Sequence, residues 1–490
     1  MNNKPRPIMF VGTGSDVGKS VINAAFCRIF KQDGYNPAPF KAQNMSLNSY
    51  ATPDNLEIGR AQAMQAEACG IECMVEMNPI LLKPTSYLSS QVVLNGKPVG
   101  NKSASEYFLD TNREKLFDEA FKSFIKLHSK FSPIVIEGAG SISEVNLWDK
   151  DITNMRVALK ANAATYLVAD IDRGGVFGSV FGTIELLPKN QRNLIEGIII
   201  NKFRGDIKLF EEGKNILEKL TKKPVVGVIP YFKDIYLEQE DSVVIDHKTS
   251  TSQRGKINIC VVLIPHLSNF TDFDSLEGVS EVHLYYSNNT QEIKKADIVI
   301  LPGSKSTIAD FCYIHETGIA DTIIQMHSEG KQVYGICGGF QMMGKKIYDH
   351  DNIEGDIKEI NGLGILPITT TISKVKKTEQ VKFSFLNDSK LCSGYEIHMG
   401  VTNSINNSPL CIIDGVADGY FLNERTWGTY IHGIFDNSVV MEYILKQVRP
   451  GIEVKQNFFE FKNKEYDRLA NHVRCSVDME LIYQSLNISI

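Results

Sequence analysis

A glycine-rich segment near the start of the chain, Gly12–Ser20, restricts the possible folds more than any other feature. The apolar run IMFV precedes it and the helical pattern VINAAFCRIF follows it, which predicts a strand, a loop and a helix. Glycines let the backbone N–H groups of such a loop converge on phosphate oxygens, and the helix N-terminus adds positive potential. We therefore predict a nucleotide-binding loop whose ATP-contacting residues are Thr13, Gly14, Ser15, Asp16, Val17, Gly18, Lys19 and Ser20.

Several side chains are expected to complete this nucleotide site. Lys19 is expected to reach the terminal phosphates and the Ser20 hydroxyl to ligate Mg²⁺. Glu137 ends the apolar run IVIE, and ligands of open α/β sheets bind at the carboxyl ends of strands, so Glu137 is the preferred second metal ligand. The remaining candidates are Glu57 as a further metal ligand, Lys41 opposite the transferred phosphoryl group, and Asn201 at the nucleotide base. For Glu57, an ordinary solvated glutamate on a helix face is an equally common alternative.

Short β-branched runs alternate with amphipathic stretches in two successive blocks. The runs are IMFV, IVIE, ATYLVAD, GIIIN and VVGVIP in the first block, and residues 257–264, 297–301 and 333–336 in the second. Such continuous apolar runs between helices are typical of buried parallel strands in doubly wound α/β domains. We therefore predict an α/β fold with a phosphate-loop domain at 1–245, a polar linker at 246–256 and a second α/β domain at 257–440. A helical extension, 441–490, is expected to pack on the second domain.

Length and composition agree with this division. A single core usually stops growing at about 250 to 300 residues, and this chain has 490. A net charge of −6 gives no general attraction for nucleic acid or an anionic membrane, and no apolar run approaches the ~20 residues that span a bilayer. Nine scattered cysteines and a start without a signal-peptide core indicate reduced thiols. We expect a cytoplasmic protein that acts on small molecules.

A second reactive segment, Val333–Gln341, has the pattern of a nucleophile elbow. An apolar strand ends at Cys337, small residues on both sides permit a strained turn, and a helical pattern follows. A helix N-terminus favours the reactive thiolate form of such a cysteine. A cysteine nucleophile needs a base, for which His432 in GTYIHGIFD is preferred and His398 in GYEIHMG is the alternative.

The glycine-flanked cysteine, the upstream PGS turn and the late histidine resemble the class I glutamine amidotransferase domain, which releases ammonia through a glutamyl thioester. The resemblance implies that Cys337 is the nucleophile, and that Gly303, Gly338 and Gln341 contact the oxyanion or the glutamine. Most of that class have a glutamate two residues after the histidine, where this chain has Ile434. The third member is therefore missing or comes from elsewhere, as in the cobyrinic and cobyric acid synthase branch.

The whole chain resembles the cobyric acid synthase family, and its phosphate loop resembles that of dethiobiotin synthetase-like ATPases, although Thr13 stands where a glycine is usual. The segments that carry the resemblance include SDVGKS, PFKAQNMSLNS, EIGRAQA, DIDRGGVFG, SNFTDFD, LPGSKST, YGICGGFQMMG, GYEIHMG and YIHGIFD. The resemblance implies that the chain uses ATP, Mg²⁺ and L-glutamine to amidate the b, d, e and g carboxylates of adenosylcobyrinic acid a,c-diamide. The product would be adenosylcobyric acid, in cobalamin biosynthesis.

Two alternatives stay open. Cobyrinic acid a,c-diamide synthase shares both domains but amidates two other side chains, and the segments KAQNMSLNS and LLKPTS favour the first interpretation over it. The second alternative is a corrinoid-binding or regulatory protein without activity, against which Lys19, Ser20 and Cys337 argue.

Overall fold

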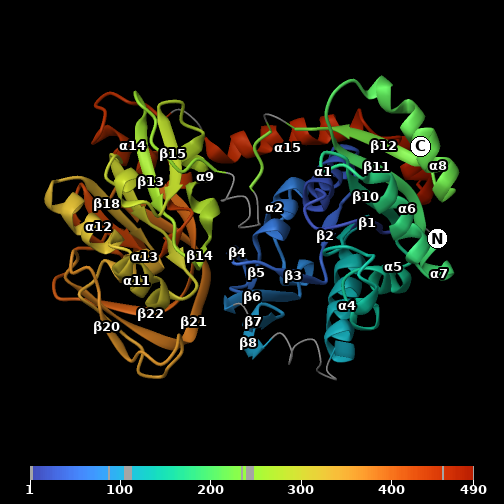
Figure 1. Cartoon of the computed structure of the whole chain (residues 1–490). Helices are drawn as coiled ribbons and strands as arrows, with labels where there is room; N and C mark the ends of the chain where they lie inside the picture. Colours follow the sequence, from blue (N-terminus) through green and yellow to red (C-terminus); the bar gives the residue numbers. More distant parts are fainter. Residues whose placement is uncertain are drawn as a thin grey trace. The chain divides into compact units, whose positions relative to one another are not determined.

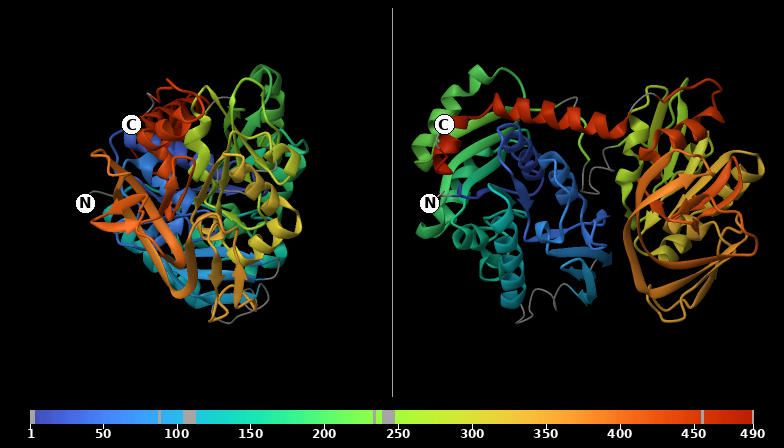
Figure 2. Two further views of the ribbon diagram at one scale, coloured as in Figure 1. Left: turned by 90° about the vertical axis from the view of Figure 1, so that its left-hand side faces the viewer. Right: turned by 180° about the vertical axis from the view of Figure 1, so that it is seen from behind.

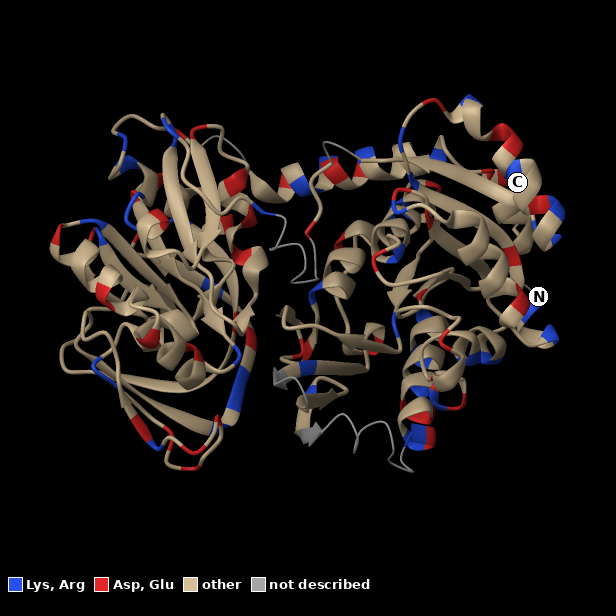
Figure 3. Cartoon of the chain, viewed as in Figure 1, with Lys and Arg blue, Asp and Glu red and all other residues tan. Residues whose placement is uncertain are grey.

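The computed structural model describes residues 4–86, 89–103, 113–232, 235–238, 248–454 and 457–488, which form two compact units (Figure 1). Unit 1 comprises Met1–Met45, Ile58–Leu237 and Lys462–Ile490, and unit 2 comprises Ser46–Glu57 and Glu238–Phe461. Within the described ranges, no helix has the length and apolar character needed to cross a membrane. Figure 3 shows acidic and basic residues interspersed along the helices and loops of each unit.

Unit 1 is built on a six-stranded parallel sheet with the order β12-β11-β10-β1-β9-β2. Its strands are β1 (Ile8–Gly12), β2 (Ala38–Phe40), β9 (Ile134–Glu137), β10 (Ala164–Asp170), β11 (Ile195–Phe203) and β12 (Val225–Pro230). Every residue of β1, β9 and β10 is buried, and because successive side chains point to opposite faces, both faces of the sheet are covered. The five strands predicted for this block are confirmed.

Helices surround this sheet, and a smaller sheet adjoins it. The α-helices are α1 (Lys19–Gln32), α2 (Arg60–Cys69), α4 (Arg113–Lys130), α5 (Met155–Ala161), α6 (Val176–Leu186), α7 (Lys189–Arg192), α8 (Glu211–Thr221), α15 (Phe458–Arg474) and α16 (Met479–Ser485). The smaller sheet has the order β3-β6-β7-β8, with β3 (Gln43–Met45), β6 (Ile80–Ser86), β7 (Ser89–Leu94) and β8 (Lys97–Ser103). A separate two-stranded sheet pairs β4 (Ser49–Ala51) with β5 (Glu57–Gly59).

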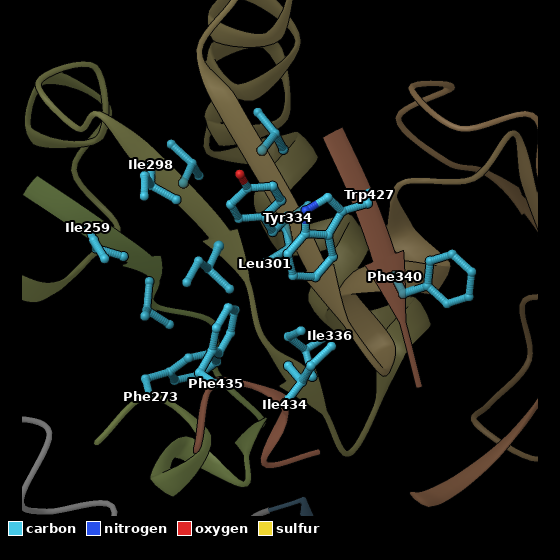
Figure 4. Packing of buried hydrophobic residues seen from close by; sticks show 14 of the residues in the cluster. Ile259, Phe273, Ile298, Leu301, Tyr334, Ile336, Phe340, Trp427, Ile434 and Phe435 are labelled. Carbon is cyan, nitrogen blue, oxygen red and sulfur yellow. The ribbon is translucent and has the colours of Figure 1, made fainter. Parts of the chain in front are cut away.

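Unit 2 has its own six-stranded sheet, with the order β15-β13-β16-β18-β26-β25. The strands are β13 (Ile257–Val262), β15 (Val282–Ser287), β16 (Ile298–Leu301), β18 (Gln332–Ile336), β25 (Tyr420–Asn423) and β26 (Thr426–Thr429). All pairs are parallel except the antiparallel edge β25·β26. In its core, Tyr334 and Trp427 from neighbouring strands stack with ring centroids 4.2 Å apart (Figure 4). The three strands predicted here, and with them the α/β fold class, are confirmed.

A largely antiparallel sheet completes unit 2. Its path is β20-β19-β21-β22-β27, with β23 and β24 beside β21. The strands are β19 (Lys346–Tyr348), β20 (Glu359–Asn361), β21 (Ile368–Phe385), β22 (Leu391–Ser404), β23 (Cys411–Ile413), β24 (Val416–Asp418) and β27 (Ile431–His432). The pairing of β22 with β27 sets Tyr395 opposite His432 and so joins the segments GYEIHMG and YIHGIFD. The helices are α9 (Asp274–Glu277), α10 (Thr290–Ile293), α11 (Thr307–Glu316), α12 (Ile319–Ser328), α13 (Gly338–Met342) and α14 (Ser438–Lys446).

The C-terminal residues 462–490 belong to unit 1, so the expectation that all of 441–490 packs on the second domain is wrong for this part. Leu469 and Ile482 are fully buried in the same core cluster as Phe10 of β1. In Figures 1 and 2 the C-terminus lies near the N-terminus, where the Arg6 N–H donates to the Leu486 carbonyl at 3.0 Å. Helical periodicity reveals an apolar face, but it does not reveal which core that face joins.

This packing predicts a stability effect. Leu469→Ala keeps a good helix former but leaves a cavity in the core of unit 1, so we expect a loss of about 2 to 5 kcal/mol of unfolding free energy. A urea titration followed by circular dichroism measures it, with the exposed Lys464→Ala on the same helix as control. An unchanged unfolding midpoint for Leu469→Ala would contradict the placement of α15.

The expected linker does not form a separate segment where the structure describes it. Residues 246 and 247 lie outside the described residues. Further along, the Thr249 carbonyl accepts from Tyr286 N–H at 3.0 Å, and the Ser252 N–H donates to Glu292 at 3.1 Å. The described part of 246–256 is thus hydrogen bonded to unit 2.

Candidate active sites

Cys337 occupies the sharp turn between β18 and α13, and the strand, turn and helix predicted around it are present. Its φ of 50° lies in the left-handed region, which is strained for any residue with a side chain. The neighbouring glycines allow close packing, because a Cβ on Gly335 would lie 2.6 Å from Met343 Sδ and one on Gly339 would lie 2.0 Å from the Leu301 carbonyl oxygen. A cysteine held in this conformation projects from a rigid support.

His432 is the imidazole next to this thiol. Its Nδ1 lies 2.7 Å from Asp272 Oδ2, and both side chains are 2% exposed. Burial alone would lower the pKa of His432, but the Asp272 carboxylate and then the Cys337 sulfur outweigh burial and raise the pKa to about 10. At neutral pH the ring is therefore protonated beside Cys337.

Asp272 is the member that sequence reasoning missed. It lies in the 3₁₀ turn η5 (Phe270–Phe273), 160 residues before His432, and its Oδ1 also accepts from the Gly433 N–H at 3.0 Å. Ile434, at the position where a glutamate is usual, is buried. The only signal in the sequence was one of the two aspartates in the segment SNFTDFD, which by itself does not indicate a partner.

His398, the alternative base, has other partners. Its Nδ1 lies 2.8 Å from the Gly400 carbonyl and its Nε2 lies 3.3 Å from Glu396 Oε1. The ring also stacks on Tyr430 with centroids 3.8 Å apart. With both ring nitrogens engaged away from Cys337, the geometry favours His432 as the base.

The structure brings the other predicted residues of this site to the same turn. A Cβ on Gly303 would lie 3.3 Å from His432 Cε1, and one on Gly338 would lie 2.8 Å from the Ser304 backbone nitrogen. Gln341 is buried in α13, and its Nε2 donates to the Tyr430 hydroxyl at 3.3 Å. The roles of Gly303, Gly338 and Gln341 at the oxyanion or the glutamine stay predictions.

In unit 1 the phosphate loop links β1 to α1 as predicted. Gly18 caps the helix with φ 96°, a conformation that favours glycine. Lys19 Nζ donates to the carbonyl of Gly14 at 2.9 Å and of Gly140 at 3.0 Å. Asn201 is buried, and its Nδ2 donates to the Val17 carbonyl at 2.8 Å, so it supports the loop backbone. Its contact with a nucleotide base stays a prediction.

Glu137 is the centre of a buried polar cluster beside the loop. Its Oε1 lies 2.8 Å from Ser20 Oγ and 2.7 Å from Lys41 Nζ, and its Oε2 accepts from Gln65 at 2.6 Å. Burial disfavours the carboxylate, but the Lys41 ammonium and the hydrogen bonds from Gln65 and Ser20 outweigh burial and lower the pKa of Glu137. Gln65 was missed, because a glutamine on a helix carries no distinctive motif.

Two of the three predicted metal ligands are hydrogen bonded to each other. Ser20 and Glu137 provide a hydroxyl and a carboxylate oxygen, which are ligands that Mg²⁺ prefers. Glu57 is buried, and its carboxylate pairs with Lys376. The role of Glu57 as a metal ligand stays a prediction. Within the described ranges, no three His, Cys, Asp or Glu side chains converge as a metal site.

Comparisons with known proteins match a family model to each of two successive parts of the chain. Residues 8–243 match the CobQ/CobB/MinD/ParA nucleotide binding domain, and residues 258–440 match the CobB/CobQ-like glutamine amidotransferase domain. The chain is 55% identical to cobyric acid synthase of Bacteroides fragilis over 491 residues, which cover 99% of each chain. It is 57% identical to that of Parabacteroides distasonis over 498 residues, 99% of this chain and 100% of the relative.

This chain belongs to the cobyric acid synthase family. Its glutamine amidotransferase domain makes it a glutamine-hydrolysing carbon–nitrogen ligase, and the family places it in amidation for cobalamin biosynthesis. The nucleotide-binding domain indicates that this member of the family uses ATP. The sequence motifs predicted both the family and the enzyme class, and both predictions are confirmed.

Proposed function

We propose that this chain uses ATP, Mg²⁺ and glutamine to convert adenosylcobyrinic acid a,c-diamide into adenosylcobyric acid by amidating its b, d, e and g carboxylates. The observation that carries the proposal is one chain with two preorganised centres, Glu137 beside the phosphate loop and Cys337 beside His432 and Asp272. Relatives that share 55% and 57% of its residues over their full length are named cobyric acid synthase, which supports this substrate.

At the second centre, Asp272 holds His432 as an imidazolium, which stabilises the Cys337 thiolate. The sulfur attacks the side-chain carbonyl carbon of glutamine, the C–N bond breaks, and His432 gives its proton to the leaving nitrogen, which departs as ammonia. Neutral His432 then takes a proton from water, and the resulting hydroxide attacks the thioester. The glutamic acid side chain leaves and releases its proton to solvent, so that glutamate is the product, and the thiolate and imidazolium are restored.

At the first centre, a carboxylate becomes an acyl donor only when phosphorylation provides a good leaving group. Lys19 and Lys41 supply positive charge for the phosphoryl group that passes from ATP to the substrate carboxylate. Ser20 and Glu137 would hold Mg²⁺, which neutralises phosphate charge when bound. Ammonia then attacks the acyl phosphate carbon, and inorganic phosphate leaves. The remaining proton passes to solvent.

Mass spectrometry of the corrinoid product tests the substrate. The protein is incubated with ATP, Mg²⁺, glutamine and either cobyrinic acid or its a,c-diamide. We expect four successive amidations of the a,c-diamide. A protein that amidates cobyrinic acid but ignores the a,c-diamide would instead be a cobyrinic acid a,c-diamide synthase.

The pair His432 and Asp272 makes a further prediction. Asp272→Asn removes the largest of the interactions that raise the pKa of His432, so this pKa falls and the imidazolium is lost at lower pH. We expect glutamate release at neutral pH to fall by roughly 10² to 10⁴-fold, and the alkaline limb of its pH profile to move to lower pH. Amidation with added ammonium is the internal control and should not change. An unaltered pH profile would show that Asp272 does not control His432.

A further inference from the structure

Residues 46–57, here called the inserted segment, have no role in the chemistry above. The chain leaves unit 1 after Met45 and returns to it at Ile58, yet these twelve intervening residues belong to unit 2. They begin inside KAQNMSLNS, one of the segments that separates the two synthase alternatives. Asn48 and Ser49 are each 1% exposed, so the first part of the segment is buried, whereas residues 53–55 are exposed.

The inserted segment is hydrogen bonded to the turn that carries Asp272. Asn48 Oδ1 accepts from the Phe270 N–H at 3.1 Å, at the first residue of η5. Asn269 makes two bonds to Ser49, accepting from its N–H at 3.3 Å and donating to its carbonyl at 3.2 Å. Asn269 has φ 54°, so this turn starts from a conformation that needs support from its partners.

The same contacts extend to His432. Asn269 Nδ2 donates to the Tyr395 hydroxyl at 3.1 Å, and that hydroxyl lies 3.5 Å from Asp272 Oδ1. The Tyr395 ring stacks on the His432 ring, with the ring centroids 5.2 Å apart. The ring of Tyr50, in the inserted segment, contacts the Tyr395 ring, with the centroids 4.5 Å apart. The inserted segment therefore touches the two groups, η5 and Tyr395, that fix the positions of Asp272 and His432.

Further contacts anchor the inserted segment along β21. Gln380 Nε2 donates to the Ala51 carbonyl at 2.9 Å. Glu57 and Lys376 form an ion pair in which the carboxylate is fully buried and the ammonium nearly so. A buried ion pair of this kind fixes one arrangement, because separating the charges inside the protein is costly.

In sequence, both ends of the inserted segment continue into residues of the Glu137 cluster. Lys41, which pairs with Glu137, precedes the segment by five residues. Gln65, which donates to Glu137, follows its last residue by eight, in the helix α2. Binding of ATP and Mg²⁺ at Ser20 and Glu137 changes the charges that Lys41 and Gln65 contact, at the two points from which the segment departs.

We propose that the inserted segment couples the two centres by positioning Asp272 and His432 according to the state of the ATP site. This inference rests on the proposed function, because it assigns a regulator to the glutaminase reaction. Ammonia released before an acyl phosphate exists is protonated and lost, so a device that delays glutamine hydrolysis has a chemical purpose. The segment is a positioning element, since its contacts with the Asp272 and His432 pair pass through η5, Asn269 and Tyr395.

The variant Asn48→Ala tests this coupling in the full-length enzyme. Glutamate release is measured with glutamine alone and with ATP, Mg²⁺ and adenosylcobyrinic acid a,c-diamide added. In the wild type we expect these additions to stimulate release by roughly 5- to 150-fold, the usual range of coupling between two sites. In Asn48→Ala the stimulation should fall to near onefold, while amidation with added ammonium stays at the wild-type rate.

The matched control is Asp54→Ala, an exposed residue in the same segment, which should keep the full stimulation. Tyr50→Leu removes the ring contact with Tyr395 and should lose the stimulation as Asn48→Ala does, which guards against misfolding of one variant. Three results would overturn the coupling. The first is a wild type whose glutamate release is not stimulated, and the second is stimulation in Asn48→Ala and Tyr50→Leu that equals that of the wild type. The third is a loss of ammonium-dependent amidation in these two variants as large as their loss of stimulation. A wild type that neither releases glutamate nor amidates the corrinoid would overturn the proposed function itself, and the coupling with it.

Discussion

Cys337→Ala is expected to abolish glutamate release and glutamine-dependent amidation, by at least about 10⁴-fold, because no other group replaces the sulfur as nucleophile. Amidation with added ammonium should persist, since Ser20, Lys41 and Glu137 of the ATP centre belong to unit 1 and Cys337 belongs to unit 2. Glutamate release and corrinoid mass spectrometry, run in parallel with both nitrogen sources, measure the two effects.

Cys312→Ala is the control for this result, because Cys312 is a partly exposed cysteine of α11 in the same unit. It should behave as wild type in both assays. Unchanged use of glutamine by Cys337→Ala would refute the assignment of the nucleophile. Loss of ammonium-dependent amidation as well would show that the two centres are not chemically separable.

Lys19→Ala is expected to abolish amidation with glutamine and with ammonium alike, by roughly 10³-fold or more. Lys19 Nζ is fixed at the phosphate loop by the Gly14 and Gly140 carbonyls, and without it the transferred phosphoryl group loses a neutralising charge. No acyl phosphate then forms, so neither nitrogen source has a substrate. Corrinoid amidation and phosphate release from ATP are the two measurements.

Lys31→Ala provides the comparison, since Lys31 is an exposed lysine in the last turn of the same helix α1. Its rates should match those of the wild type. Glutamate release from glutamine alone should survive in Lys19→Ala, because Cys337 and its partners lie in the other unit. Retained corrinoid amidation would mean that the loop does not bind ATP as proposed.

Much of the fold was predictable because the signals are local. The run ATYLVAD predicts a strand wherever it lies in a sheet, and all seven of its residues are buried in β10. The antiparallel sheet of unit 2 was not foreseen, because β21 and β22 are long, half-exposed strands whose alternation is weak against a background of charged residues. Such strands are defined by their pairing more than by their own composition.

The residues of the candidate sites were likewise predictable only where the signal in the sequence is local. Cys337 and Lys19 were found because a strained turn and a phosphate-binding turn each require glycine at fixed offsets. Asp272 and Gln65 were missed, because each acts through hydrogen bonds to residues far away in the sequence. The ion pair of Glu57 with Lys376 was also not foreseen, because the two residues lie far apart in the sequence.

The sequence by itself determined eight strands of the two six-stranded sheets, the phosphate loop, the cysteine turn and the family, because each depends on residue types within a few positions of one another. Only the tertiary structure decided the partner of His432, the core that residues 462–490 join, and the transfer of residues 46–57 into unit 2. The physical reason is that buried charges and apolar faces need partners, and the partner is chosen by the packing of the whole chain.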